Sequence, residues 1–159
     1  LQVLYRAGLR VEEVCNLTPA DVDLSGGFIL VQQGKGHKDG TIPIDAETIQ
    51  WLKKWMEKRI PGPYLFVSHR GKKLDQSYIR KVCYQCSEKS GVYIQDGKNR
   101  VPIHPHVLRH CYATELLEEG YTLAEVQRLL RHSNISVTSI YLSVRPVDLA
   151  AKIRGRETA

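Results

Sequence analysis

The chain has 159 residues, of which 42% are hydrophobic and 25% charged, and this balance is typical of one globular domain with its own core. It contains no run of 18 apolar residues and shows no secretory leader, so we expect a cytoplasmic protein without a membrane partner. Lys and Arg outnumber Asp and Glu by 23 to 17, which favours a polyanionic partner. Because the chain begins at Leu1, inside an apolar pattern and not at a Met, we expect a fragment of a longer protein.

The first part of the chain alternates between helical and strand patterns. Residues 1–7 and 11–17 have apolar side chains at helical spacing. Residues 28–33 and 41–44 are rich in strand formers, and the GKGHKDG segment between them is typical of a hairpin turn. Pro43 has no amide hydrogen to donate, so the second strand is expected to be short or to lie at a sheet edge.

The remainder of the chain is mostly helical in pattern. Asp45 can cap a helix that runs to about Arg59, and a second helix is expected over residues 75–90. A short strand over residues 65–67 and a small excursion or hairpin over residues 92–101 are also expected.

Three helices and a last helical stretch then close the chain. The first covers residues 106–119 and ends at Gly120, and a capping box of Thr122 and Glu125 opens the next. The others are expected over residues 136–142 and 146–153. Together these elements predict an α+β fold, mostly helical with a small antiparallel sheet.

Two cysteines and two histidines follow one another in the order of a zinc finger. Cys83 and Cys86 precede His106 and His110, but the gap between the pairs is longer than usual in such fingers. The cysteines share a helical face with apolar residues, which favours small core side chains. We therefore expect no metal and no disulfide, and a zinc-dependent hydrolase remains only a weaker alternative.

The segment HPHVLRH, residues 104–110, places three histidines and an arginine at a helix start. His106, Arg109 and His110 share one stripe that becomes apolar further along, so these groups are expected to point toward the protein body or into a cleft at its edge. A helix N-terminus beside arginine and histidine suits a phosphate or a carboxylate. Taken alone, the segment could equally be structural, with Arg109 pairing a carboxylate.

Four other segments contain an arginine, a lysine, a histidine and a tyrosine that belong with HPHVLRH in the interpretation. Arg10 lies in GLRVEEV, Lys35 in GKG, His132 in LLRHSN, and Tyr141 in SIYLSV nine residues later. With HPHVLRH, and in this order, these segments resemble the signature of the tyrosine recombinases, also called the phage integrase family. The resemblance covers essentially the whole chain. It implies that residues 1–159 form a catalytic domain of the DNA breaking-rejoining enzyme fold, without the N-terminal core-binding domain.

The resemblance implies a phosphate-binding role for four residues. Arg10 and Arg109 would clamp the non-bridging oxygens of a scissile phosphate, a bidentate task that suits the rigid guanidinium fork. His106 and His132 would hydrogen-bond the phosphate and assist proton transfer.

The same resemblance gives the bond exchange to two further residues. Tyr141 would attack as the nucleophile and form a 3′-phosphotyrosyl link, and Lys35 would protonate the leaving 5′ oxygen as general acid. Because the link keeps the bond energy, rejoining needs no ATP. Because the arginines stabilise the charge of the transition state, no metal or other cofactor is expected.

Each of these residues also has an ordinary structural interpretation. Arg10 could pair with Glu13, which is compatible with Glu13 orienting Arg10 for a phosphate. Lys35 could be a solvated hairpin lysine, His132 a helix C-terminal histidine, and Tyr141 a core aromatic side chain.

One residue departs from the family pattern. Arg131 stands before His132, where the family more often has glycine, and this puts the conformation of the local turn in doubt.

The resemblance implies double-stranded DNA as the partner, with four protomers assembled on two DNA sites and no small-molecule substrate. The apolar residues of segment 146–156 could dock on a neighbouring protomer or on their own domain. Basic residues are expected to gather near the site and contact phosphates. They are Lys35, His37, Lys38, Arg70, Lys72, Lys73, Arg80, Lys81, Lys98, Arg100, Arg128 and Arg131.

The function expected from the resemblance is DNA recombination or integration, as in a mobile element. Two alternatives remain open at this point. One is a type IB topoisomerase, which relaxes supercoils by similar chemistry, and the other is an inactive DNA-binding domain of the same fold.

Overall fold

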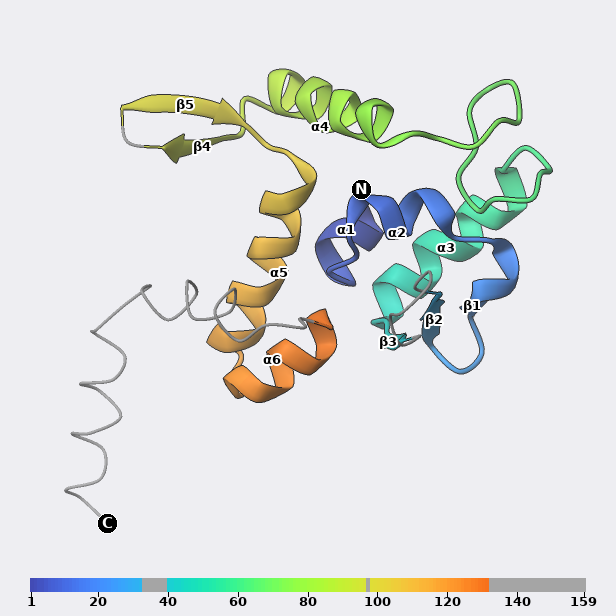
Figure 1. The fold of residues 1–159 in the computed structure, drawn as a ribbon, viewed down its shortest axis with the longest axis horizontal. Helices are drawn as coiled ribbons and strands as arrows, with labels where there is room; N and C mark the ends of the chain where they lie inside the picture. The colour runs from blue at the N-terminus through green and yellow to red at the C-terminus, as the bar shows by residue number, and fades with distance from the viewer. Residues whose placement is uncertain (33–39, 97, 132–159) are drawn as a thin grey trace, which may run out of the picture.

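The structure, a computed structural model, describes residues 1–32, 40–96 and 98–131 (Figure 1). The helices in this part are α1 (Gln2–Arg6), α2 (Val11–Asn16), the 3₁₀ helix η1 (Pro19–Asp21), α3 (Ala46–Lys58), α4 (Gln76–Ser90), α5 (Pro105–Glu118) and α6 (Leu123–Leu130). The strands are β1 (Val22–Asp23), β2 (Phe28–Val31), β3 (Gly40–Pro43), β4 (Tyr93–Asp96) and β5 (Asn99–Pro102). The α+β class is confirmed, while the helices expected over residues 136–142 and 146–153 lie outside the described residues.

The first two helices are joined by a tight turn at Gly8. Its φ is +57°, a conformation that favours glycine, and a side chain there would clash with the ring of Tyr112 on α5. The next residue, Leu9, is fully buried in the core. The turn therefore brings the backbone of α1 close to α5 and leaves Arg10 as the N-cap of α2.

A side-chain contact also fastens α1 to α5. The Tyr5 hydroxyl donates a short hydrogen bond to the carboxylate of Glu115. This bond, reinforced by burial and by the charge of Glu115, raises the pKa of Tyr5 to about 12. The two helices pack side by side, so the N-terminal segment is held against the helix that carries HPHVLRH (Figure 1).

Strands β1, β2 and β3 form an antiparallel sheet in chain order. Ile29 pairs with Ile42 and both are buried, whereas Phe28, opposite Pro43, is exposed. One face of the sheet therefore packs on the core, as alternation requires. The expected hairpin is confirmed, and Pro43 lies on the edge strand β3. Strand β1 was not predicted because two residues are too few to show a pattern.

Helix α3 begins where the sequence indicates. The Asp45 carboxylate accepts a hydrogen bond from the Thr48 amide at 2.6 Å, which is the predicted N-cap. Arg6 of α1 bonds to Asp45 at 2.9 Å and to Glu47 at 2.6 Å, so the same cap also ties α3 to the first helix.

The strand predicted over residues 65–67 is wrong. Leu65 is fully buried and its amide donates to the Leu17 carbonyl at 2.7 Å. Val67 forms only an isolated bridge with Lys73. Residues 65–67 therefore form a bend that is attached to the end of α2 through Leu65, because their backbone partners are single positions and not a neighbouring strand.

Helix α4 buries a narrower stripe than predicted. Cys83 is 1% exposed, as expected of a core residue, but Cys86 is exposed. The next buried position is Ser87, whose hydroxyl accepts a hydrogen bond from the Ile103 amide at 2.7 Å. The core interpretation was therefore wrong for Cys86, because the buried stripe follows positions four residues apart.

The segment after α4 forms the antiparallel hairpin β4–β5, with Tyr93 opposite Pro102. A hairpin was one of the two predicted options for this segment.

The helix of HPHVLRH, α5, starts at Pro105 and is followed by Gly120 at a φ of +97°. The capping box is confirmed, since the Thr122 amide donates to Glu125 at 2.7 Å. No helix in the described ranges is long and apolar enough to cross a membrane.

Apolar side chains form two clusters, and α5 contributes to both. The larger combines α1, α2, the three-stranded sheet, α3 and α4, with Leu108 of α5 packed against it. The smaller joins α5 and α6 through Ala113, Leu116, Val126 and Leu130. Figure 1 shows α5 running alongside both the blue N-terminal helices and orange α6. The candidate site lies where these three parts meet.

Candidate functional site

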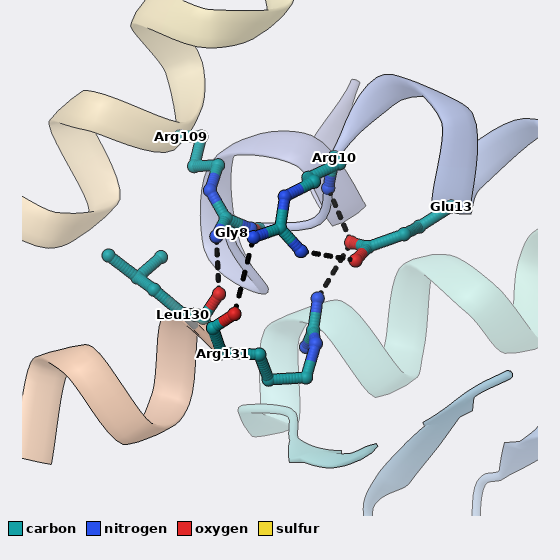
Figure 2. Close-up of polar contacts among 6 residues, drawn as sticks. All are labelled: Gly8, Arg10, Glu13, Arg109, Leu130 and Arg131. Carbon is teal, nitrogen blue, oxygen red and sulfur yellow. Dashed lines mark hydrogen bonds and ion pairs between the residues drawn. The ribbon is translucent and has the colours of Figure 1, made fainter. Parts of the chain in front are cut away.

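Four charged residues from three elements form the candidate site, which we call the arginine cluster: Arg10, Glu13, Arg109 and Arg131. Figure 2 shows them converging from the turn before α2, the first turns of α5 and the end of α6. The cluster contains three guanidinium groups and one carboxylate, which Arg10 and Arg131 share, so its net charge is positive, as a phosphate site requires.

Arg109 is buried and holds two segments together. It is 5% exposed, and its guanidinium donates short hydrogen bonds to the carbonyl oxygens of Gly8 and Leu130 (Figure 2). The Leu130 carbonyl belongs to the last turn of α6, where carbonyls lack helical partners and the helix dipole is negative. A buried charge is tolerated only when it is hydrogen-bonded in this way. Arg109 thus links the α1–α2 turn to the C-terminus of α6.

Arg10 is oriented by Glu13, as predicted. The Arg10 amide donates to Glu13 Oε2 at 2.6 Å and its Nη1 to Oε1 at 2.9 Å. Its Nη2 donates to the carbonyl oxygen of Arg131 at 3.2 Å. The side chain of Arg10 keeps 37% of its surface exposed, whereas that of Glu13 keeps 8%. Arg10 is therefore partly accessible, while the buried carboxylate of Glu13 fixes its orientation.

The two predicted phosphate-binding arginines lie side by side. Arg109 bonds to the carbonyl of Leu130 and Arg10 to that of Arg131, which are consecutive residues at the end of α6. Their guanidinium groups are drawn next to each other in Figure 2. The backbone of α6 thus brings together two side chains that lie far apart in the sequence.

The backbone of Arg131 shows the conformation of the turn that ends α6. It has φ 53° and ψ 44°, which is the left-handed conformation that glycine favours at a helix C-terminus. The turn is therefore formed although the residue is an arginine. Its side chain reaches back to Glu13, with Nη2 at 2.6 Å from Oε2. Sequence reasoning placed Arg131 among the general basic residues and noted it as a departure at the turn, but missed this contact.

Glu13 stays ionised in this environment. Burial alone would raise its pKa, but the charge of Arg131, the Arg10 amide and the charge of Arg10 outweigh burial, so the pKa of Glu13 lies below its ordinary value. A carboxylate held charged in this way is a stable anchor for both arginines.

The histidines lie around the N-terminus of α5. His106 is exposed, whereas Arg109 and Ala113 are buried, so the prediction that the stripe points inward is wrong for His106. The buried stripe starts instead at Pro105, because the proline ring packs inward at the first position of α5. Burial lowers the pKa of His104, and nearby His106 adds to this effect. The ring centroids of His104 and His106 are 6.4 Å apart.

Three predicted site residues, Lys35, His132 and Tyr141, lie outside the described residues. His132 directly follows Arg131, so it continues the chain from the carbonyls that hold both arginines. Within residues 1–32, 40–96 and 98–131, no three His, Cys, Asp or Glu side chains lie together as metal ligands would.

Further basic side chains are exposed on α4 and on the β4–β5 hairpin. Arg80 and Lys81 are exposed on α4, and Lys98 and Arg100 are exposed on the β4–β5 hairpin. The Arg100 guanidinium lies 4.5 Å from the ring centroid of Tyr93, a cation–π contact that orients it.

Comparisons with known proteins identify the class. The model of the phage integrase family matches residues 1–146, and the chain therefore belongs to the phage integrase family. It is 42% identical over 146 residues to tyrosine recombinase XerA of Thermococcus kodakarensis, covering 89% of this chain and 49% of that protein.

Solved structures agree with this assignment. A crystal structure of XerA recombinase superposes with a TM-score of 0.81 at 31% identity, covering 99% of this chain and 56% of that chain. The XerH site-specific recombinase bound to its difH substrate superposes with a TM-score of 0.72 at 28% identity, covering 95% of this chain and 42% of that chain. The chain spans about half the length of these relatives.

Proposed function

We propose that the chain is the catalytic part of a site-specific DNA recombinase or integrase, which cuts and rejoins strands of double-stranded DNA. The observation that carries this proposal is the pairing of Arg10 and Arg109 on consecutive carbonyls at the end of α6. Two adjacent guanidinium forks are suited to bind the two non-bridging oxygens of one phosphodiester. The similarity to tyrosine recombinases supports the same chemistry.

The described residues bind the phosphate in this proposal. Arg109 is rigid because it is buried and hydrogen-bonded, and Arg10 is held by Glu13, so little rearrangement is needed when DNA binds. His106 lies one turn before Arg109 on α5 and is exposed, so it can reach a phosphate bound at the cluster. His132 is proposed to hydrogen-bond the same phosphate.

Tyr141 is proposed as the nucleophile and Lys35 as the general acid. The phenol oxygen of Tyr141 forms a bond to phosphorus, and the bond from phosphorus to the 5′ oxygen breaks. Lys35 gives a proton to that oxygen, and the phenol proton passes to His106 or His132. A free tyrosine has a pKa of about 10, so a cationic pocket that stabilises the phenolate assists the attack. A 5′ hydroxyl reverses the step and releases Tyr141, without metal or ATP.

The proposed assembly is a homotetramer on two paired DNA sites, and the proposed location is the cytoplasm, where a DNA substrate of this kind is found. The exposed basic residues of α4 and the β4–β5 hairpin, Arg80, Lys81, Lys98 and Arg100, are proposed to contact phosphates. DNA binding is therefore expected to weaken steeply as the salt concentration rises.

A nicked duplex tests the proposal. DNA sites are first enriched from a randomised library by binding to the protein, and a nick next to the cleavage position then traps the covalent product. The protein should become linked to DNA through tyrosine in the presence of a chelator and without nucleotide. Tyr141→Phe should abolish the adduct, whereas Tyr121→Phe, at an exposed tyrosine after α5, should not.

Three results would contradict the recombinase function. Binding without any adduct would indicate an inactive DNA-binding domain. Relaxation of any supercoiled plasmid without a joint product would indicate a topoisomerase. Loss of the reaction on chelation would indicate a metal-dependent enzyme.

A further inference from the structure

The backbone of Arg131 adopts a conformation that calls for an explanation. Among the residues that the structure describes, it is the only one other than glycine with a positive φ, at 53°. Glycine adopts this conformation without steric cost, and an arginine does not. The side chain must therefore contribute something that glycine cannot provide.

The side chain of Arg131 is almost buried against Glu13. It is 11% exposed, and Nη2 lies 2.6 Å from Glu13 Oε2, while the Arg131 carbonyl accepts a hydrogen bond from Arg10 at 3.2 Å. Arg131 thus contacts the Arg10–Glu13 pair twice, once through its side chain and once through its backbone (Figure 2). A glycine would retain the carbonyl acceptor and lose the cation.

The stem of Arg131 lies on the first residue of β3. A side chain added at Gly40 would overlap the Arg131 Cδ atom and come within 3.4 Å of its Cγ and Nε. Gly40 pairs with Val31 and closes the GKGHKDG turn that contains Lys35. The side chain of Arg131, at the end of α6, therefore contacts Glu13 of α2 and the first residue of β3.

We propose that Arg131 is a positioning residue, which holds Glu13 in place for Arg10 and supports the foot of the β2–β3 hairpin. This inference rests on the proposed function, because positioning is meaningful only if Arg10 binds the scissile phosphate. It adds a residue that the family pattern does not assign, at a place where the family more often has glycine.

The electrostatics of Glu13 make the inference measurable. The charged groups that contact Glu13 in the described part of the chain are Arg10, on its own helix, and Arg131, on α6. Burial acts to raise the pKa of Glu13, and Arg131 provides the largest opposing contribution. Without Arg131, Glu13 takes up a proton at a higher pH, and a neutral Glu13 holds Arg10 less firmly.

The test compares variants of Arg131 in the nicked-duplex reaction at saturating DNA, as single-turnover rates over a range of pH. Arg131→Met should lower the rate by about ten- to a hundredfold, since a misplacement of 1 Å can cost about a hundredfold. The acid limb of its pH profile should move to higher pH, while the Kd for DNA changes much less than the rate. Arg131→Lys should restore most of the rate, and Arg131→Gly should behave like Arg131→Met. Lys58→Met, on the exposed end of α3, should match the wild type.

Several outcomes would overturn the inference. If Arg131→Met keeps the wild-type rate, the inference is wrong. If its rate falls by the same factor at every pH and Arg131→Lys does not restore the rate, the residue has only a structural role. Thermal melting detects a folding defect, and if Arg131→Met unfolds, the comparison of Arg131→Lys with Arg131→Gly decides the question. If the wild type itself forms no Tyr141-dependent adduct, the proposed function fails and this inference fails with it.

Discussion

Replacing Arg109 by lysine tests whether this buried guanidinium holds the site together. Its two short hydrogen bonds, to the carbonyls of Gly8 and Leu130, join the α1–α2 turn to the C-terminus of α6. Hydrogen bonds to a charged group contribute about 1.5–3 kcal/mol each. Lysine keeps the charge, but its compact ammonium lacks the fork that reaches two separated acceptors. We therefore expect Arg109→Lys to lose about one bond, or roughly 1.5–3 kcal/mol of unfolding free energy.

Urea denaturation of both proteins measures this difference directly. Arg128→Lys is the matched control, because Arg128 is exposed on α6 and a surface substitution of this kind changes stability by less than about 0.5 kcal/mol. If Arg109→Lys were equally neutral, the two hydrogen bonds would not stabilise the fold and the rigidity assigned to Arg109 would be refuted. If Arg109 binds the scissile phosphate as proposed, the same variant forms covalent adduct far more slowly than the wild type, since lysine offers a single point contact in place of the fork.

Three further predictions concern the surroundings of the cluster. Gly8→Ala should lower the free energy of unfolding, measured by urea denaturation, by at least about 1–2 kcal/mol, because alanine is strained in the left-handed conformation. The clash with Tyr112 should lower it further, and an unchanged stability would contradict the described turn. Glu13 has a lowered pKa, so its contribution to stability is present above the ordinary value of 4.5 and is lost as the pH falls through its folded pKa. Melting curves should therefore lose this contribution on acidification in the wild type and not in Glu13→Gln. Tyr5 should titrate near pH 12, and its contribution should disappear between about pH 10 and 12; NMR should show a pKa nearer 10 in Glu115→Gln.

Helix ends were predicted well because they depend on neighbouring residues. Asp45 caps α3 through an amide three residues away, and the Thr122–Glu125 box does the same for α6. The pairing of β2 with β3 and the edge position of Pro43 were also predicted from local features, two strand-like runs and a missing amide hydrogen, while residues 33–39 between the strands lie outside the described ranges.

The failures occurred where burial decides the outcome. Residues 65–67 have a strand-like composition, yet they lie in a bend fastened to Leu17. Cys86 and Ser87 are adjacent, and only packing determines that Ser87 is inside, where its hydroxyl meets the Ile103 amide. His106 is exposed for the same reason, because the position of α5 on α1 and α6 selects the buried stripe.

For the site, the sequence by itself determined the residue types and their order: Arg10 next to Glu13 on one helix start, and Arg109 one turn after His106 on another. These follow from positions a few residues apart, where helical spacing fixes which side chains are neighbours. Tertiary structure alone decided that Arg10 and Arg109 share the end of α6, and that Arg131 reaches Glu13. The physical reason is that the acceptors are backbone carbonyls and a distant carboxylate, which become available only when α6 packs against α5.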